Sequence, residues 1–206
     1  DQIGHHTAYK ARGRGTEQYN KVGCYFRPNY ERGLLIYSLI KKNKLKSYLE
    51  VGYGRGYSAM CAALAFSELG EGKVVTVDPA LSQTEIERAR NIFGKEFVDY
   101  ITFVHARSQD YLPTLDETFD MVYIDGDHTV DAVRNDWEHT KDKYNKFLLF
   151  DDYHKKDIQA DIECSQVIDE IEDESKELII MDRRIFLDDR QKTDEEINYG
   201  QVLLTK

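Results

Sequence analysis

Cysteine and proline are scarce in this chain of 206 residues, which has only three of each. The cysteines, Cys24, Cys61 and Cys164, are odd in number and form no C-x-x-C pair, so neither a zinc ribbon nor a disulfide framework is indicated. Three widely spaced, reduced thiols favour a cytoplasmic protein. With so few prolines, no repeat and no low-complexity tract, nothing in the sequence marks a linker between two domains.

Basic residues are also in deficit, since 28 Lys and Arg stand against 38 Asp and Glu, for a formal net charge of −10. A nucleic-acid-binding protein needs a basic face for phosphates and a polybasic membrane anchor needs the same charge, so both classes are disfavoured. No apolar run approaches the ~20 residues of a membrane-spanning helix. The expected partner is therefore a small molecule, without nucleic acid or membrane, and a homodimer is left open.

Short apolar runs alternate with helical stripes from residue 30 onward. Runs typical of buried strands lie at 47–51, 73–77, 101–105, 120–124 and 147–150. Stretches with helical periodicity separate or follow them, at 30–42, 57–69, 85–93, Val130 to Trp137 and Ile158 to Ile171. Two further runs, Leu178–Met181 and Tyr199–Thr205, have no long helix between them and are expected to pair antiparallel.

This alternation predicts a Rossmann-like α/β fold, with a seven-stranded, mostly parallel sheet, helices on both faces and an antiparallel final strand. Residues 30–206 are expected to form one domain, preceded by an N-terminal extension at 1–29 that is a candidate substrate lid. Ligands of such sheets bind beyond the carboxyl ends of the strands, so the residues that follow each strand are the ones to examine for chemistry.

The first strand runs into the segment Glu50-Val51-Gly52-Tyr53-Gly54-Arg55-Gly56-Tyr57-Ser58. Glycines allow a sharp turn and a close approach of the backbone to a ligand, and the next helix offers its N-terminal amides. The third glycine comes one position too early for the dinucleotide pattern G-x-G-x-x-G. Three interpretations of the segment stay open: a cofactor loop of another class, a nucleotide-binding loop and a plain glycine-rich turn.

The acidic-x-G-x-G-x-G pattern resembles that of class I S-adenosylmethionine-dependent methyltransferases. Asp78 ends the second strand, where a carboxylate can accept both hydroxyl protons of a ribose, or can merely cap a helix. Ser108-Gln109 follows the third strand, and in catechol O-methyltransferase-like enzymes such a pair contacts the adenine. The resemblance implies these S-adenosylmethionine contacts: Glu50, Gly52, Tyr53, Gly54, Gly56, Ser58, Asp78, Ser108, Gln109 and Asp125.

Acidic residues gather after the fourth and fifth strands, as Asp125, Asp151 and Asp152. Neighbouring strands lie about 5 Å apart, so these carboxylates are expected to converge and to repel one another unless a cation joins them. An oxygen-rich set of this kind suits Mg²⁺ or Ca²⁺ better than zinc. The alternative is that Asp125 and Asp127 cap the following helix.

The same arrangement resembles metal-dependent O-methyltransferases of the catechol type and of the macrolide and aminocoumarin sugar type. That resemblance implies Mg²⁺ on Asp125, Asp151 and Asp152, and a proton acceptor at either His128 or Asp127. One departure is that Tyr144-Asn145-Lys146 replaces the family's usual turn before the fifth strand.

Three hypotheses follow from the sequence. The first is Mg-assisted methyl transfer to a hydroxyl of a small polyhydroxylated acceptor, sugar-like or catechol-like. The second is a small-molecule methyltransferase that needs no metal, and the third is a non-catalytic S-adenosylmethionine-binding module.

Overall fold

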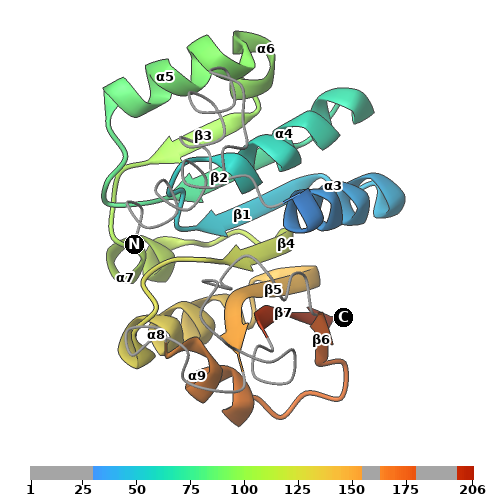
Figure 1. Ribbon diagram of the computed structural model, residues 1–206, viewed down its shortest axis with the longest axis vertical. Helices are drawn as coiled ribbons and strands as arrows, with labels where there is room; N and C mark the ends of the chain where they lie inside the picture. The colour runs from blue at the N-terminus through green and yellow to red at the C-terminus, as the bar shows by residue number, and fades with distance from the viewer. Residues whose placement is uncertain (1–29, 155–162, 180–198) are drawn as a thin grey trace, which may run out of the picture.

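The computed structural model describes residues 30–154, 163–179 and 199–206. Seven strands form one sheet in the order β3-β2-β1-β4-β5-β7-β6, which Figure 1 shows across the middle of the molecule. The strands are β1 (Ser47–Val51), β2 (Lys73–Val77), β3 (Ile101–Val104), β4 (Phe119–Ile124), β5 (Tyr144–His154), β6 (Glu177–Ile179) and β7 (Tyr199–Thr205). All pairs among the first five are parallel, whereas β7 is antiparallel to both β5 and β6. The predicted fold class is therefore confirmed.

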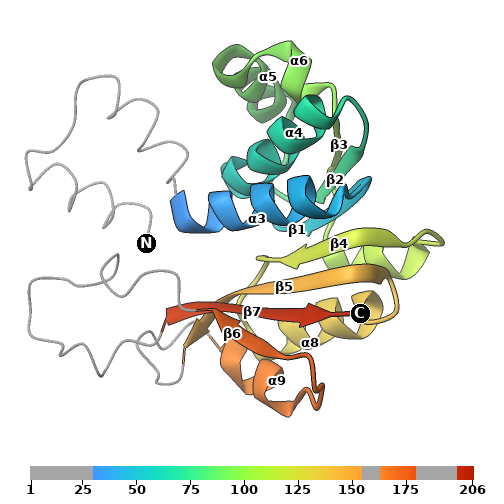
Figure 2. The ribbon, with the colours of Figure 1, turned by 90° about the vertical axis from the view of Figure 1, so that its right-hand side faces the viewer.

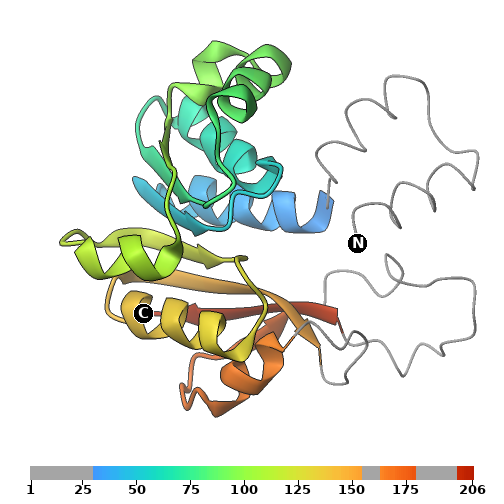
Figure 3. The ribbon, with the colours of Figure 1, turned by 90° about the vertical axis from the view of Figure 1, so that its left-hand side faces the viewer.

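Helices cover both faces of the sheet. One face carries α3 (Tyr30–Asn43), α4 (Tyr57–Leu69), α5 (Gln83–Phe93) and α6 (Lys95–Val98). The other carries α7 (Ser108–Tyr111), a 3-10 helix (Leu112–Thr114), α8 (Val130–Thr140) and α9 (Cys164–Glu170). In Figure 2 α3 and α4 lie towards the viewer, and in Figure 3, from the opposite side, α8 lies in front of the sheet. We refer to these two faces as the α3 face and the α8 face.

Strand alternation divides the core between these faces. Tyr48 and Tyr123 pack on the α3 face, against Ile36 and Ile40 of α3, and the two tyrosine rings stack at a centroid distance of 6.5 Å. Their neighbours in sequence, such as Leu49, pack on the α8 face. Successive strand residues point to opposite faces, except at the irregularities between Phe119 and Met121 in β4 and between Phe150 and Tyr153 in β5.

The order of the strands reverses at β1, whose neighbours are β2 on one side and β4 on the other. This is the switch point of the sheet, where the connections diverge and a crevice opens beyond the strand ends. The glycine loop follows β1 and the acidic residues follow β4 and lie in β5, so the two candidate halves of the site meet at one edge.

The fifth strand is longer at both ends than the sequence predicted. Tyr144, Asn145 and Lys146 were expected to form a turn, but they are the first residues of β5, where Tyr144 pairs with Phe119. Strand β5 also continues past Phe150, through both aspartates, to His154.

Several predicted features lie outside the described residues, among them the N-terminal extension at 1–29, Ile158 and Ile162 of the predicted helical stripe, and Met181. Within the described ranges, no helix combines the length and the apolar character that crossing a bilayer demands.

Candidate active site

The glycine loop takes a backbone path that side chains would block. Gly52, Gly54 and Gly56 all have positive φ angles, of 91°, 52° and 79°. A Cβ on Gly52 would overlap the carbonyl oxygen of Asp125 and lie 2.6 Å from its carbonyl carbon, so glycine lets the loop pass directly beside the end of β4. A Cβ on Gly54 would meet nothing within 4 Å. The loop therefore offers open backbone on one side, which fits a cofactor cradle.

Asp78 joins the end of β2 to this loop. Its Oδ2 accepts the backbone N–H of Gly54 at 3.0 Å, and its Oδ1 accepts that of Ala80 at 2.7 Å. The carboxylate is half-buried and lies beside the open central glycine. The residue predicted to bind the ribose hydroxyls is thus next to the predicted cofactor loop.

Glu50 is a fully buried carboxyl in β1. Ser58, in the first turn of α4, donates to one of its oxygens, and Thr76 of β2 donates to the other at 2.7 Å. Burial raises the pKa of Glu50 to about 7, although both hydroxyl bonds and the charge of Arg32 oppose the shift. Glu50 and Ser58 therefore act on the predicted cofactor site by tying together β1, β2 and the start of α4, on either side of the loop.

Tyr53 and Gly56 complete the predicted loop residues. The Tyr53 ring is buried and packs edge-on against Phe103, with 5.5 Å between centroids. A Cβ on Gly56 would overlap the Tyr53 ring, so this glycine is required for the tyrosine to fold inward. The ring therefore belongs to the core, and the loop can meet a cofactor only with its backbone at this position.

The predicted adenine contacts, Ser108 and Gln109, begin α7 beyond the end of β3. Gln109 is exposed, whereas Ser108 is half-buried. Asp136 of α8 is buried, and burial raises its pKa, although the neighbouring Ser108 hydroxyl opposes the shift. Ser108 thus lies between α7 and α8, beyond the end of β3.

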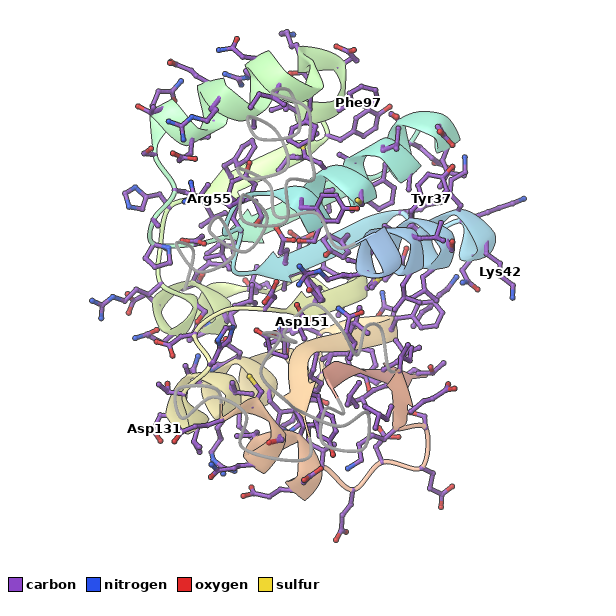
Figure 4. The ribbon with its side chains drawn as sticks, viewed as in Figure 1. Tyr37, Lys42, Arg55, Phe97, Asp131 and Asp151 are labelled. Atoms are coloured by element: carbon purple, nitrogen blue, oxygen red, sulfur yellow. The ribbon has the colours of Figure 1, made fainter. Side chains whose placement is uncertain are left out.

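The three predicted metal ligands lie near one another, but Asp151 and Asp152 have different partners. Asp151 contacts Arg32 and Tyr123, whereas Asp152 contacts His128. The φ angle of Asp152 is 55°, at an irregularity of the pairing between β5 and β7. Figure 4 shows Asp151 near the middle of the molecule, between the ribbons of β4 and β5.

On the α3 face, Asp151 is held by protein groups at both carboxylate oxygens. Its Oδ1 accepts the amide of Gln201 from β7 at 2.9 Å. Its Oδ2 accepts the Tyr123 hydroxyl at 2.8 Å and the guanidinium of Arg32 from α3. The same guanidinium nitrogen lies 3.2 Å from Oδ2 of Asp125, so Arg32 bridges the ends of β4 and β5.

Towards the α8 face, Asp152 pairs with a histidine. Nε2 of His128 lies 2.8 Å from Oδ2 of Asp152, and this hydrogen bond is the main reason that the pKa of His128 rises to about 9. At neutral pH His128 therefore carries a proton. A small pocket at this point is lined by Asp125, His128, Asp151 and Cys164, among others.

Asp127, the other predicted proton acceptor, is exposed and accepts the backbone N–H of Thr129 at 2.9 Å. Thr129 is the N-cap residue of α8. Asp127 therefore shapes the turn that precedes this helix, but it is not the N-cap residue, so the capping role that the sequence left open for it does not apply. Asp125 does not have that role either, since its carboxylate faces Arg32 and Tyr123.

The predicted Mg²⁺ set does not fit the arrangement of the described side chains. Among them, the group of three possible ligands that forms is Asp125, His128 and Asp152, without Asp151. Both oxygens of Asp151 accept hydrogen bonds, and the Arg32 guanidinium lies where a cation between Asp125 and Asp151 would lie. A set with an imidazole is also a poorer match to Mg²⁺, which prefers oxygen ligands.

Sequence reasoning missed three residues of this site: Arg32, Tyr123 and Gln201. Arg32 precedes Ile36 and Ile40 by one and two helical turns, so it lies on the inward stripe of α3. An arginine on an apolar stripe is a signal, because arginine is almost never buried unless it is paired. Gln201 in an otherwise apolar strand run carries the same kind of signal.

The glycine loop at the switch point, the acidic residue after β2 and the polar edge beyond β4 and β5 define a class I S-adenosylmethionine-dependent methyltransferase. A family profile described as a methyltransferase domain matches residues 49–153, which is half of the chain, and the chain belongs to this family. The matched segment runs from β1 to the acidic pair of β5. No curated protein sequence matches the chain.

Solved structures share the fold at low sequence identity. An O-methyltransferase from Bacillus cereus, in complex with S-adenosylhomocysteine, has a TM-score of 0.63 and 15% identity, over 100% of this chain and 90% of that one. The O-methyltransferase TomG from Streptomyces achromogenes, involved in tomaymycin synthesis and bound to S-adenosylmethionine, has a TM-score of 0.65 and 15% identity, over 100% and 99%. The Podospora anserina methyltransferase PaMTH1 has a TM-score of 0.59 and 17% identity, over 100% and 87%.

Proposed function

We propose that this chain transfers the methyl group of S-adenosylmethionine to a hydroxyl of a small polyhydroxylated acceptor, sugar-like or catechol-like. The observation that carries the proposal is the contact between the two halves of the site. Gly52 of the glycine loop passes directly beside the backbone of Asp125, whose side chain opens the polar edge. A methyl donor in the loop would therefore lie next to an edge that can accept protons from hydroxyl groups.

The donor would be held by the residues identified from the sequence, with the backbone of the loop from Gly52 to Gly56 beside it, Asp78 at the ribose, and Ser108 and Gln109 at the adenine. When bound, S-adenosylmethionine supplies an electrophilic methyl group on a sulfonium. The protein's contribution is to align the acceptor oxygen with that methyl group, and alignment alone can supply several kcal/mol of barrier reduction.

The acceptor hydroxyl must lose its proton as the carbon–oxygen bond forms, and His128 or Asp127 is proposed to take it. In the described arrangement His128 is protonated and paired with Asp152, so it can take a proton only after it has lost its own. Asp127 is the more accessible carboxylate. Separate His128→Gln and Asp127→Asn variants, compared by turnover at saturating donor, distinguish the two.

Mg²⁺ bound to Asp125, Asp151 and Asp152 stays a prediction from the family resemblance. The hydrogen bonds of Asp151 and the position of Arg32 give more support to the second hypothesis, a small-molecule methyltransferase that needs no metal. A cytoplasmic location and a small-molecule partner likewise stay predictions. Whether the protein forms a homodimer stays open.

Turnover tests the proposal against a non-catalytic binding module. The protein would be incubated with S-adenosylmethionine carrying a labelled methyl group, together with a panel of catechols, sugars and sugar-bearing compounds. We expect release of S-adenosylhomocysteine and label on an acceptor oxygen for at least one class. Binding of S-adenosylhomocysteine by calorimetry without turnover of any acceptor would favour the binding module instead.

Asp78 should contribute strongly to the affinity for the donor. For Asp78→Ala we expect affinity for S-adenosylhomocysteine, measured by calorimetry, to fall by ~10- to 100-fold, because a hydrogen bond to a charged group contributes about 1.5–3 kcal/mol. Asp99→Ala, at an exposed ion pair with Lys95, is the matched control and should bind as the unaltered protein does. Unchanged affinity in a folded Asp78→Ala protein would remove Asp78 from the cofactor site.

A further inference from the structure

Asp125, Asp151 and Asp152 form the acidic edge of the sheet, and the chain itself supplies a cation to this edge, the guanidinium of Arg32. It reaches from α3 to three groups on two strands: Asp125 at 3.2 Å, the Tyr123 hydroxyl at 3.0 Å, and Asp151. Its side chain is 17% exposed and that of Asp151 only 2%. This is a buried, multiply bonded ion pair rather than a surface contact, and such pairs are costly to break because a lone charge stays behind.

Two of the three carboxylates of the edge already face a cation of the chain. Arg32 faces both Asp125 and Asp151, so one guanidinium is shared between the ends of β4 and β5. The sequence argument for Mg²⁺ rested on the repulsion among these carboxylates. The Arg32 guanidinium between Asp125 and Asp151 opposes that repulsion, although burial and the charge of Asp151 still raise the pKa of Asp125.

A dissolved Mg²⁺ ion would have to displace the Arg32 guanidinium, which is attached to helix α3. Ile36 and Ile40, on the same stripe of α3, are fully buried in the core, so the helix that carries Arg32 is fixed in place. A charge fixed in this way acts at a high effective concentration compared with a dissolved ion. Mg²⁺ also demands near-octahedral oxygen geometry and loses its water reluctantly.

We infer that Arg32 is a positioning residue that takes the place of a divalent cation, holding Asp125 and Asp151 in register so that methyl transfer at this edge needs no metal. The inference about transfer rests on the proposed function, whereas the inference about cation binding does not. Removal of the guanidinium should free the Asp125 and Asp151 oxygens that face it, so that a dissolved cation can bind between them.

The test measures Mn²⁺ binding, by electron paramagnetic resonance of the free ion, to the full chain and to its variants. Arg32→Met keeps the length and apolar character of the side chain and removes its charge. Arg134→Met, which breaks an exposed ion pair with Glu170, is the matched control. We expect Arg32→Met to bind one Mn²⁺ at least ~10-fold more tightly than the unaltered protein and the control, because the tethered competitor is gone.

Two outcomes would overturn the inference. One is that the unaltered protein binds Mn²⁺ as tightly as Arg32→Met does, and the other is that a folded Arg32→Met protein binds none. Arg32→Lys, which keeps a cation on α3, should bind Mn²⁺ as weakly as the unaltered protein. If Arg32→Met fails to fold, the unaltered protein decides alone: tight Mn²⁺ binding that is lost in Asp125→Asn contradicts the inference, and weak binding in the unaltered protein supports it.

Turnover gives a second, independent readout. With an acceptor identified as above, the unaltered protein should keep its rate in excess EDTA, and Arg32→Met should lose turnover and regain it with added Mg²⁺. A merely structural role of Arg32 would give no such rescue. If no acceptor is turned over, the proposed function fails, and the Mn²⁺ measurement still decides the role of Arg32.

Discussion

Gly52→Ala should lower the free energy of unfolding by ~3 kcal/mol or more, through backbone strain and a clash that cannot relax cheaply. The φ angle of 91° is one that alanine rarely adopts, and its Cβ would overlap the backbone carbonyl of Asp125. The loop cannot shift away without loss of other bonds. The Gly52 N–H donates to Val77 at 2.9 Å, and the Asp125 N–H donates to Val51 at 2.9 Å.

Gly54→Ala is the matched control for this prediction. Its φ angle of 52° is also positive, but its Cβ would meet nothing within 4 Å, so only the conformational cost of about 1 kcal/mol applies. Urea denaturation of both variants measures the difference. Equal stabilities for the two would show that the close approach of the loop to β4 does not constrain position 52.

Glu50→Gln should make the stability of the protein less dependent on pH. The folded-state pKa of Glu50 is about 7, above the ordinary value of 4.5, so the folded state holds this proton where the unfolded state has lost it. The unaltered protein therefore loses stability as pH rises from about 4.5 to about 7. A shift of this size corresponds to ~3 kcal/mol, present in full below the unfolded pKa and gone above the folded one.

The measurement is the free energy of unfolding of the unaltered protein minus that of Glu50→Gln, at several pH values between about 5 and 8. We expect this difference to fall by about 2–3 kcal/mol over the range. Glutamine keeps the shape of the side chain and can still bond with the Ser58 and Thr76 hydroxyls. Glu71→Gln, at an exposed ion pair with Lys46, controls for loss of a carboxylate. A difference that stays flat with pH contradicts a raised pKa at Glu50.

The sheet and the cofactor loop could be predicted because they depend on local patterns. Short apolar runs that end at glycine or aspartate gave β1, β2 and β4 to within a residue, and helix α4 has the predicted bounds, Tyr57–Leu69. The position of Asp78 beside the loop follows from the order of the strands alone. Such features need no knowledge of which side chains pair across the sheet.

The charge arrangement of the edge could not be predicted in the same way. Helix α3 was identified from its apolar residues, yet Leu34 among them is 65% exposed, whereas Arg32 is directed inward. A helix prediction that uses only the spacing of apolar residues does not show that an arginine is buried. The acidic pair was placed after the fifth strand, but β5 continues to His154 with an irregularity at Asp152, and Asp151 contacts Arg32 whereas Asp152 contacts His128.

The acidic edge also has an order of assembly. The cofactor loop and its partners come from one short stretch, between Glu50 and Asp78, whereas the bonds that fix Asp151 join it to Arg32, 119 residues earlier, and to Gln201, 50 residues later. During synthesis the cofactor half of the site can form well before the acceptor half, because N-terminal parts of a chain are available to fold first. The hydrogen bond that fixes Oδ1 of Asp151 therefore forms only once β7, which lies between β5 and β6, has been made.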